Sequence, residues 1–287
     1  MTDVVISLVP AAAAGVYIFG LRTLWVILVT VFFCVAAESA VMKIRKKAQA
    51  VGDVSAVVTG VLLAVNLPPE IPLWIAATGG AVAIVIVKQL FGGIGQNFMN
   101  PALGARVIMV ISWPAQMTAW VMPRGTDALS SATPLAIAKT GGDLPPLIDM
   151  FLGKTGGCIG ETSALALLLG AAYLLARRVI KPDIPFMYIG TFTVLTLIFK
   201  GDVLFHLFAG GLMIGAFFMA TDYSSTPMTR KGRLIFGFGC GLLTFIIRFY
   251  TGYNEGVSFA IILMNLLTPL IDGLTIPENF GGVKADA

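Results

Sequence analysis

Residues 24–42 read L-W-V-I-L-V-T-V-F-F-C-V-A-A-E-S-A-V-M and contain a single ionisable side chain, Glu38. A helix needs about 20 mostly apolar residues to cross the hydrocarbon core of a bilayer, about 30 Å thick. The run has this length and lacks the polar–apolar alternation of a membrane β-barrel strand. It therefore predicts a transmembrane helix and an all-α protein rather than a barrel.

The composition of the whole chain supports this interpretation. Of the 287 residues, 57% are hydrophobic and 12% are charged, whereas soluble domains average about 25% charged residues. Such a chain would expose large apolar patches in water, so we expect an integral membrane protein and exclude a disordered chain, a disulfide scaffold and a cytosolic enzyme. The net charge of +4 does not indicate nucleic-acid binding, because in a membrane protein the placement of basic residues in the loops matters more.

Ten apolar runs qualify as membrane spans, and the third is short because it stops at Leu67-Pro68-Pro69. The expected spans are residues 4–20, 24–42, 54–67, 71–87, 102–122, 160–176, 184–199, 203–220, 233–249 and 257–274. With the N-terminus in the cytoplasm, thirteen of the nineteen Lys and Arg residues fall on the cytoplasmic side. The positive-inside rule then predicts a multi-pass membrane protein with both termini cytoplasmic.

Short matches between the two halves predict an internal repeat. Gly52-Asp53-Val54 recurs as Gly201-Asp202-Val203, Lys88 and Gly92 as Arg248 and Gly252, and Met99-Asn100 as Met264-Asn265. Five spans per half would make the second half inverted, as in many transporters. We expect repeats over residues 1–122 and 159–287, joined by an external loop over residues 123–158. Chance similarity among Gly- and Ala-rich helices is the alternative.

The expected external loop contains the sequence D-A-L-S-S-A-T-P-L-A, residues 127–136. Thr133 precedes Pro134, which favours an extended backbone that presents the hydroxyl to a modifying enzyme. An ordinary Ser/Thr-rich turn is the other interpretation of the same residues.

This sequence resembles the flavinylation motif of the NqrB/RnfD family, whose members are membrane subunits of the Nqr and Rnf complexes. The matching positions are Asp127, Ser130, Ser131, Ala132 and the acceptor Thr133. Further blocks similar to the family lie at residues 92–102, 210–222, 230–237 and 256–272, so the resemblance covers most of the chain. It implies a fold related to urea transporters, and FMN joined to Thr133 through a phosphoester by a dedicated flavin transferase.

The resemblance also implies a function. We expect a subunit, in a prokaryotic inner membrane, of an ion-translocating ferredoxin:NAD+ oxidoreductase (Rnf) complex, which passes electrons through covalent FMN while Na+ or H+ is moved. Its expected partners are the other membrane subunits, above all an external flavin-bearing subunit. A second flavin, riboflavin or FMN, nearer the cytoplasm is a further implication that no motif establishes. A quinone-reducing Nqr subunit and a urea-type permease are the alternatives. Nqr members carry a longer N-terminal extension, whereas the first span here begins almost at Met1, which favours the Rnf type.

Two departures from the family pattern concern the interior. Met99 stands between Phe98 and the Asn100-Pro101 pair where the family often has F-N-P-A, and Tyr223 follows Asp222 where the family often has Pro. Neither touches the acceptor threonine.

A few polar residues are candidates for supporting roles. Arg124, Lys139 and Lys154 could neutralise a phosphate in the loop, with solvated charge as the alternative. Asp222, Asn100 and Asn265 are candidates for the ion path, and Asp222 could instead cap a helix or pair with Arg230 or Arg233.

Other ionisable and thiol groups have simpler interpretations. Ionisable groups inside a bilayer are functional candidates by default. The alternative is structural: Glu38 is expected to pair near the basic cytoplasmic end, Arg106 to extend toward an interface, and His206 to form a structural hydrogen bond. Cys34, Cys158 and Cys240 lack the spacing of a zinc or iron–sulfur site. We therefore predict no metal site and no catalytic side chain.

Overall fold

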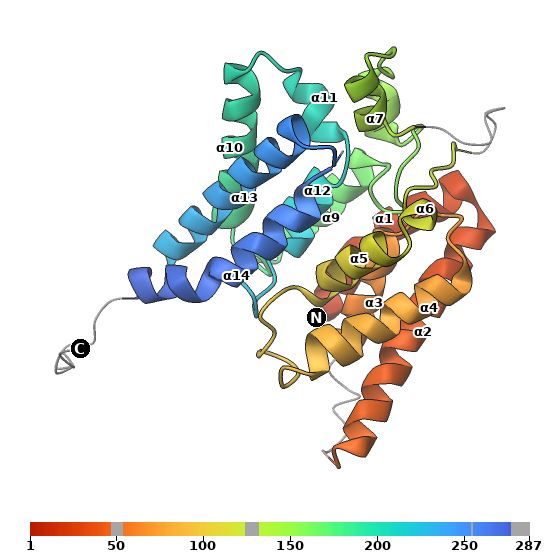
Figure 1. Ribbon diagram of the computed structural model, residues 1–287, viewed down its shortest axis with the longest axis vertical. Coiled ribbons are helices and arrows are strands. Elements are labelled where there is room, and N and C mark those ends of the chain that lie inside the picture. Colours follow the sequence, from red (N-terminus) through yellow and green to blue (C-terminus); the bar gives the residue numbers. More distant parts are fainter. Residues whose placement is uncertain (47–53, 124–131, 254, 277–287) are drawn as a thin grey trace.

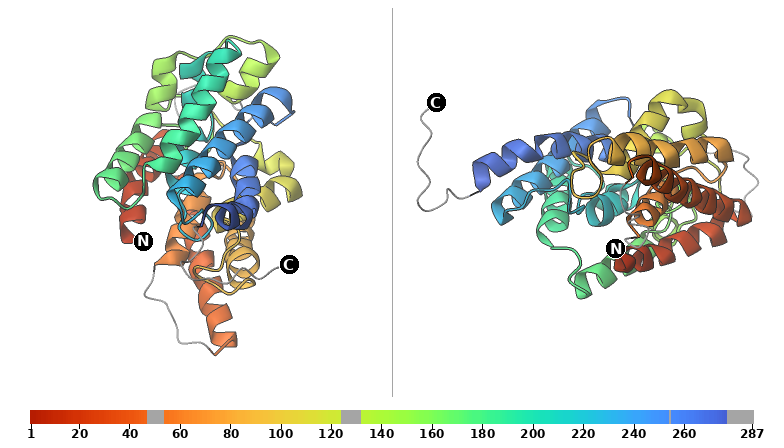
Figure 2. Two further views of the ribbon diagram at one scale, coloured as in Figure 1. Left: turned by 90° about the vertical axis from the view of Figure 1, so that its left-hand side faces the viewer. Right: turned by 90° about the horizontal axis from the view of Figure 1, so that it is seen from below.

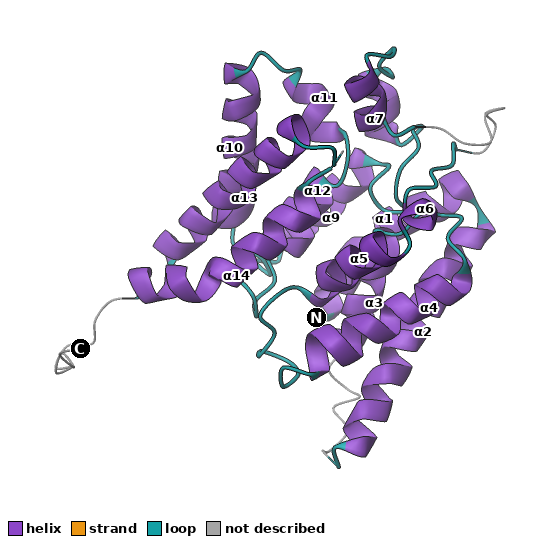
Figure 3. Cartoon of the chain, in the orientation of Figure 1, coloured by secondary structure: helices purple, strands orange, loops and turns teal. Residues whose placement is uncertain are grey.

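The computed structural model describes residues 1–46, 54–123, 132–253 and 255–276. Within these ranges the chain is helical, with turns and loops and no strand (Figure 3). The helices of the first part are α1 (Thr2–Phe19), α2 (Leu21–Ile44), α3 (Ser55–Val65), α4 (Leu73–Val82), the π-helix η1 (Ala83–Gln89), α5 (Pro101–Ser112), α6 (Pro114–Met117), α7 (Pro134–Thr140) and α8 (Leu147–Leu152). The remaining helices are α9 (Ala164–Ala176), α10 (Asp183–Ile198), α11 (Val203–Phe208), α12 (Leu212–Ile214), the π-helix η2 (Gly215–Met219), α13 (Arg230–Tyr250) and α14 (Val257–Thr275).

Four helices of the described chain, α1, α2, α13 and α14, are long and apolar enough to cross a membrane. Five shorter apolar helices coincide with other predicted spans: α3, α4 with η1, α5, α9 and α10. The predicted span at residues 203–220 is not one helix, because the chain breaks at Ala209–Gly211 and resumes as α12 and η2. The all-helical membrane class is therefore confirmed, while a set of ten continuous spans is not what the structure contains.

Local sequence explains where several helices begin and end. Asn100 caps α5 by accepting hydrogen bonds from the amides of Ala102 and Leu103, and Pro101 occupies the first position, where no amide is needed. Ser163, Asp202 and Thr229 cap α9, α11 and α13 in the same way. The short α3 ends at Val65 before Leu67-Pro68-Pro69, because proline cannot continue a helix.

The helices pack in two groups that meet along a shared interface. In one group α2 packs against α3 and α4; in the other α10 packs against α13, which in turn packs against α14. The two groups lie on opposite sides of the molecule in each view (Figures 1 and 2). The first group also includes α1 and α5, which pack against α3, and the contact between α5 and α14 joins the two groups. One continuous apolar core extends through both groups.

The contact between α1 and α9 depends on a glycine. Gly170 of α9 lies so close to α1 that a Cβ atom there would overlap the backbone carbonyl oxygen of Ser7. We expect Gly170→Ala to lower the free energy of unfolding by about 1–3 kcal/mol, the usual cost of overpacking. The measurement is thermal unfolding in detergent, with Gly190→Ala as the control, because a Cβ at this α10 glycine meets nothing within 4 Å. Equal effects of the two substitutions would contradict the close approach.

Candidate functional site

Thr133 is the N-cap of α7, and its backbone is extended as predicted, with φ −63° and ψ 156°. Its Oγ1 accepts a hydrogen bond from the amide of Ala136 at 3.2 Å. The side chain is buried, with 6% of its surface exposed, whereas the preceding Ala132 is exposed. The hydroxyl of Thr133, the predicted acceptor, therefore lies within the protein rather than in solvent.

The remaining motif residues, Asp127, Ser130 and Ser131, and the candidate cation Arg124 lie outside the described residues. Their predicted roles stay predictions.

Thr133 lines a cavity of about 200 Å³, here called the Thr133 cavity. Its walls include Trp120, Tyr253 and Phe259, and the last two rings contact each other with centroids 4.9 Å apart. The buried ion pair of Arg106 and Glu255 forms another part of the wall. An aromatic wall with one buried charged pair can hold a planar, partly polar group.

Arg106 was expected to extend toward an interface, and this expectation is wrong. Its side chain is 6% exposed, and its Nη2 donates to Glu255 Oε2 at 2.7 Å and to Cys158 Sγ at 3.4 Å. Its Nη1 donates to Asn66 Oδ1 at 3.1 Å and to Ser258 Oγ at 3.0 Å. Glu255 supplies the compensating charge from 149 positions away in the chain, so the pairing has no local sequence signal.

The two described lysines that were candidates for phosphate contact have different surroundings. Lys139 Nζ donates to the carbonyl oxygens of Thr251 and Tyr253, each at 2.7 Å, and so lies close to the Tyr253 side of the Thr133 cavity. Lys154 is exposed and lies 3.9 Å from Asp149. Of the two, Lys139 is the one that the fold brings near the cavity.

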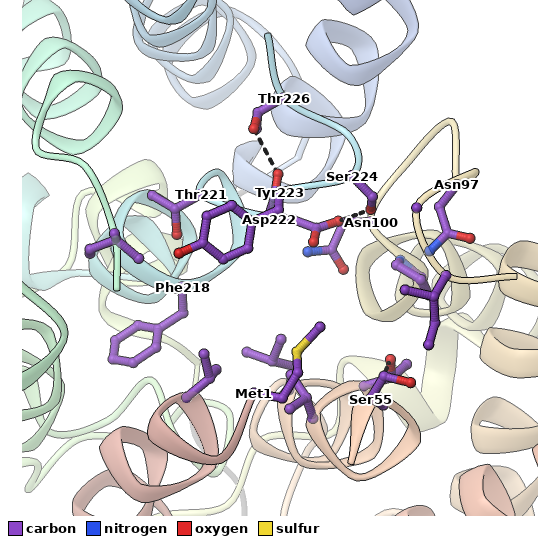
Figure 4. Close-up of a pocket in the computed structure, with 18 of the residues that line it drawn as sticks. Met1, Ser55, Asn97, Asn100, Phe218, Thr221, Asp222, Tyr223, Ser224 and Thr226 are labelled. Atoms are coloured by element: carbon purple, nitrogen blue, oxygen red, sulfur yellow. Dashed lines mark hydrogen bonds between the residues drawn. The ribbon is translucent and has the colours of Figure 1, made fainter. Parts of the chain in front are cut away.

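A second cavity, of about 520 Å³, contains Asp222, Asn100 and Lys88 in its lining and is here called the Asp222 cavity (Figure 4). The Oδ2 atom of Asp222 accepts hydrogen bonds from the hydroxyls of Ser224 at 2.9 Å and Ser225 at 3.0 Å. The alternative that Asp222 pairs with Arg230 or Arg233 does not hold, since both arginines pair with Asp183, at 3.5 and 3.0 Å. Asp222 is thus a polar group of the cavity wall.

The two asparagines of the predicted repeat meet at the interface of α5 and α14. Asn100 Nδ2 donates to the carbonyl oxygen of Met219 at 3.2 Å. In the amide orientation that satisfies both polar atoms, Asn265 accepts from the Asn100 amide at 3.1 Å and donates to the Ser225 carbonyl oxygen at 3.1 Å. Asn100 also lines the Asp222 cavity, whereas Asn265 does not.

Glu38 pairs as expected, but its partner lies elsewhere in the fold. Lys88 Nζ, with 2% exposure, donates to Glu38 Oε1 at 2.6 Å and also to the hydroxyl of Ser55. The hydrogen bond predicted for His206 concerned its side chain, whereas the bond observed is made by its backbone carbonyl oxygen, which accepts from Arg248 Nη1 at 2.7 Å. The buried Nδ1 atom of its ring, which packs on Phe249, has no partner among the described residues.

The three cysteines are free and buried. Cys158 Sγ, Glu161 and Glu255 place one potential ligand atom each within 4.8 Å of one another, a grouping that the sequence spacing did not indicate. The Arg106 guanidinium donates to both Cys158 and Glu255. A metal cation there would therefore face a fixed positive charge.

Fold and cavities define a multi-pass helical membrane protein whose described residues form cavities with mainly apolar linings that include a few polar and charged groups. Residues 1–281 match the model of the NQR2, RnfD, RnfE family. The chain belongs to this family. It is similar over 99% of its length and at 49% identity to the D subunit of the Na(+)-translocating ferredoxin:NAD(+) oxidoreductase complex of Acetobacterium woodii, of which 91% is covered.

Other relatives have names of the same kind. The chain is 45% identical to the D subunit of the proton-translocating ferredoxin:NAD(+) oxidoreductase complex of Clostridium ljungdahlii, and 40% identical to the D subunit of the ion-translocating oxidoreductase complex of Stutzerimonas stutzeri. Each match covers 98% of this chain and 91% of the relative.

Proposed function

We propose that this chain is the flavin-carrying membrane subunit of an ion-translocating ferredoxin:NAD+ oxidoreductase. Near full-length identity of 40–49% to subunits with this kind of name supports the proposal. The other membrane subunits of the complex are then its partners, among them an external subunit that bears a flavin. The names favour this function over quinone reduction or passive solute transport.

The observation that carries the proposal is the position of Thr133 in an aromatic-lined cavity. When bound, FMN would supply one- and two-electron transfer. Trp120, Tyr253 and Phe259 offer apolar faces to the ring system, and Arg106 and Lys139 bring positive charge near it. The cavity of about 200 Å³ is below the usual range of roughly 300–1,000 Å³ for ligand sites. Part of the cofactor would therefore lie outside the cavity, toward the exposed Tyr253, where a partner subunit could reach it.

Intact mass spectrometry of the purified chain tests this function. We expect a mass increment equal to FMN minus water, located on the peptide that contains Thr133, when the chain is produced together with a flavin transferase. An unmodified mass under these conditions would refute the flavin-carrying role.

We also propose the inverted-repeat arrangement, with halves at residues 1–122 and 159–287 and both termini in the cytoplasm. Equivalent spans pack alike, since α2 packs against α4 and α10 against α13. The equivalent cations Lys88 and Arg248 also make similar contacts. Lys88 binds Glu38 of α2 and Ser55 at the start of α3, while Arg248 packs on Phe192 of α10 and donates to the carbonyl oxygen of His206 in α11. In this topology the Thr133 cavity faces outward and the Asp222 cavity faces the cytoplasm.

The Asp222 cavity is the proposed location of a second flavin, riboflavin or FMN. Its volume of about 520 Å³ lies within the usual range for ligand sites. The lining includes Asn97, Asn100, Thr221 and Asp222, which offer hydrogen-bonding groups, and apolar residues such as Phe218 (Figure 4). Release of free flavin on denaturation, in addition to the covalent flavin, would be the expected result.

Asp222 is proposed to assist the passage of Na+ or H+. The names of the relatives do not fix the ion, because one is sodium-translocating and another proton-translocating at similar identity. We expect Asp222→Asn to slow ion transport by sealed vesicles several-fold at varied Na+, because it removes the negative charge of the cavity wall, and to leave the covalent flavin in place. Asp149→Asn, which changes an aspartate outside the cavity, is the control. Unchanged transport by Asp222→Asn would remove Asp222 from the ion path.

A further inference from the structure

A second buried carboxylate lies beside the wall of the Thr133 cavity. Glu161 belongs to the turn before α9 and is 6% exposed. One of its carboxylate oxygens lies within 4.8 Å of both Cys158 Sγ and an oxygen of Glu255. Glu255 lines the Thr133 cavity, whereas Glu161 does not.

Glu161 has an unsatisfied polar atom. Its Oε2 is buried and accepts no hydrogen bond within the part of the chain that the structure describes. The Arg106 donors that are assigned go to Glu255, Cys158, Asn66 and Ser258, and none goes to Glu161. Among the described residues the Cys158 thiol is the hydrogen-bond donor assigned to the Glu161 carboxyl group, which is too little to compensate a buried negative charge.

Other charges face the same carboxyl group. Arg248 of α13 is 2% exposed, and its Nη1 and Nε donate to the carbonyl oxygens of His206 and Glu255. Its Nη2 is buried and has no hydrogen-bond partner among the described residues. The charged groups that act on Glu161 are thus Glu255, Arg106 and Arg248, with the thiol of Cys158 adjacent.

These contacts favour a proton on Glu161 over a metal cation. Two carboxylates this close in a low-dielectric interior do not both ionise readily, and the one held by a guanidinium is Glu255. A cation between them would be repelled by Arg106 and Arg248. The same two guanidinium groups stabilise an ionised Glu161, so the bound proton remains exchangeable.

We propose that Glu161 is a buried proton-binding site, which holds its proton as a neutral carboxylic acid and exchanges it when the charge in the adjoining Thr133 cavity changes. The coupling passes through Arg106 and Glu255, which line that cavity and act electrostatically on Glu161. The site itself depends only on this chain. The link to flavin reduction rests on the proposed function.

Infrared spectroscopy of the purified protein tests the site directly. We expect a carboxylic-acid carbonyl band that shifts in D2O and titrates with pH, and that is lost in Glu161→Gln. The glutamine has nearly the same shape as the protonated acid, so this variant should fold. Glu70→Gln, which changes an exposed glutamate, should retain the band. A missing band in the wild type, or an unchanged band in Glu161→Gln, would overturn the proposal, as would loss of the band on adding Na+ at constant pH.

The coupling is tested on the flavin-bearing chain with dithionite as reductant. At a pH where Glu161 is partly ionised, an electron that enters the flavin should be accompanied by a proton from solvent that binds the Glu161 carboxylate. The carboxylic-acid band should then grow on reduction in the wild type and show no change in Glu161→Gln. A band that ignores reduction would overturn the coupling. A chain without covalent flavin would refute the proposed function and leave the pH titration of Glu161 as a separate result.

Discussion

We expect Thr133→Asn to abolish covalent flavin attachment. Asparagine has no hydroxyl to form a phosphoester, but its side-chain oxygen can still cap α7 as Thr133 does through Ala136. Loss of flavin then cannot be attributed to loss of the helix cap, which costs about 0.5–2 kcal/mol when Thr is replaced by Ala. The measurement is in-gel flavin fluorescence after SDS denaturation, in cells that also produce the transferase, and we expect complete loss.

The matched control for this experiment is Thr118→Ala. Thr118 also lines the Thr133 cavity and carries a hydroxyl, which donates to the carbonyl oxygen of Pro114. Its removal should leave the fluorescent band unchanged. A fluorescent band that survives Thr133→Asn would show that the acceptor is a different residue.

Lys88→Met is expected to lower the free energy of unfolding by about 3–5 kcal/mol, because it leaves the Glu38 carboxylate buried without its charged partner. The pair is enclosed, with side-chain exposures of 2% for Lys88 and 13% for Glu38. The double variant with Glu38→Gln removes the uncompensated charge and should recover much of the loss. Thermal unfolding in detergent measures both effects.

Arg22→Met provides the comparison for a surface ion pair. Arg22 and Glu70 are 3.5 Å apart, but their side chains are 46% and 56% exposed. Water screens such pairs, so we expect a change of about 0–1 kcal/mol. If Lys88→Met costs no more than Arg22→Met, the Lys88–Glu38 pair is not the enclosed contact described here.

The predicted span at residues 203–220 illustrates a limit of hydropathy. The segment is mostly apolar, so hydropathy alone predicts one continuous span, although the pair Gly210-Gly211 lies within it. The structure breaks it at Ala209–Gly211, where Gly210 has a φ of +72°. A break inside a membrane protein is tolerated when other groups satisfy the freed backbone, and here Arg248 donates to the carbonyl oxygen of His206 from 42 positions away.

Thr133 shows which properties of the candidate site follow from the local sequence and which do not. Its extended backbone was predictable because Pro134 restricts the residue before it. Its burial was not, because the walls of the Thr133 cavity come from Arg106 of α5 and from Tyr253 and Glu255 after α13. The local sequence around Thr133 contains no information about these neighbours.

The sequence by itself determined the membrane class, the helical content, the helix caps and the extended backbone at Thr133. Each of these depends on composition or on residues within a few positions, as at Asn100-Pro101 and Thr133-Pro134. Only the tertiary structure decided which ionisable groups are enclosed and with which partners, as in Lys88–Glu38 and Arg106–Glu255. A buried charge is stable only beside a compensating group, and the fold supplies that group from positions 50 and 149 residues away.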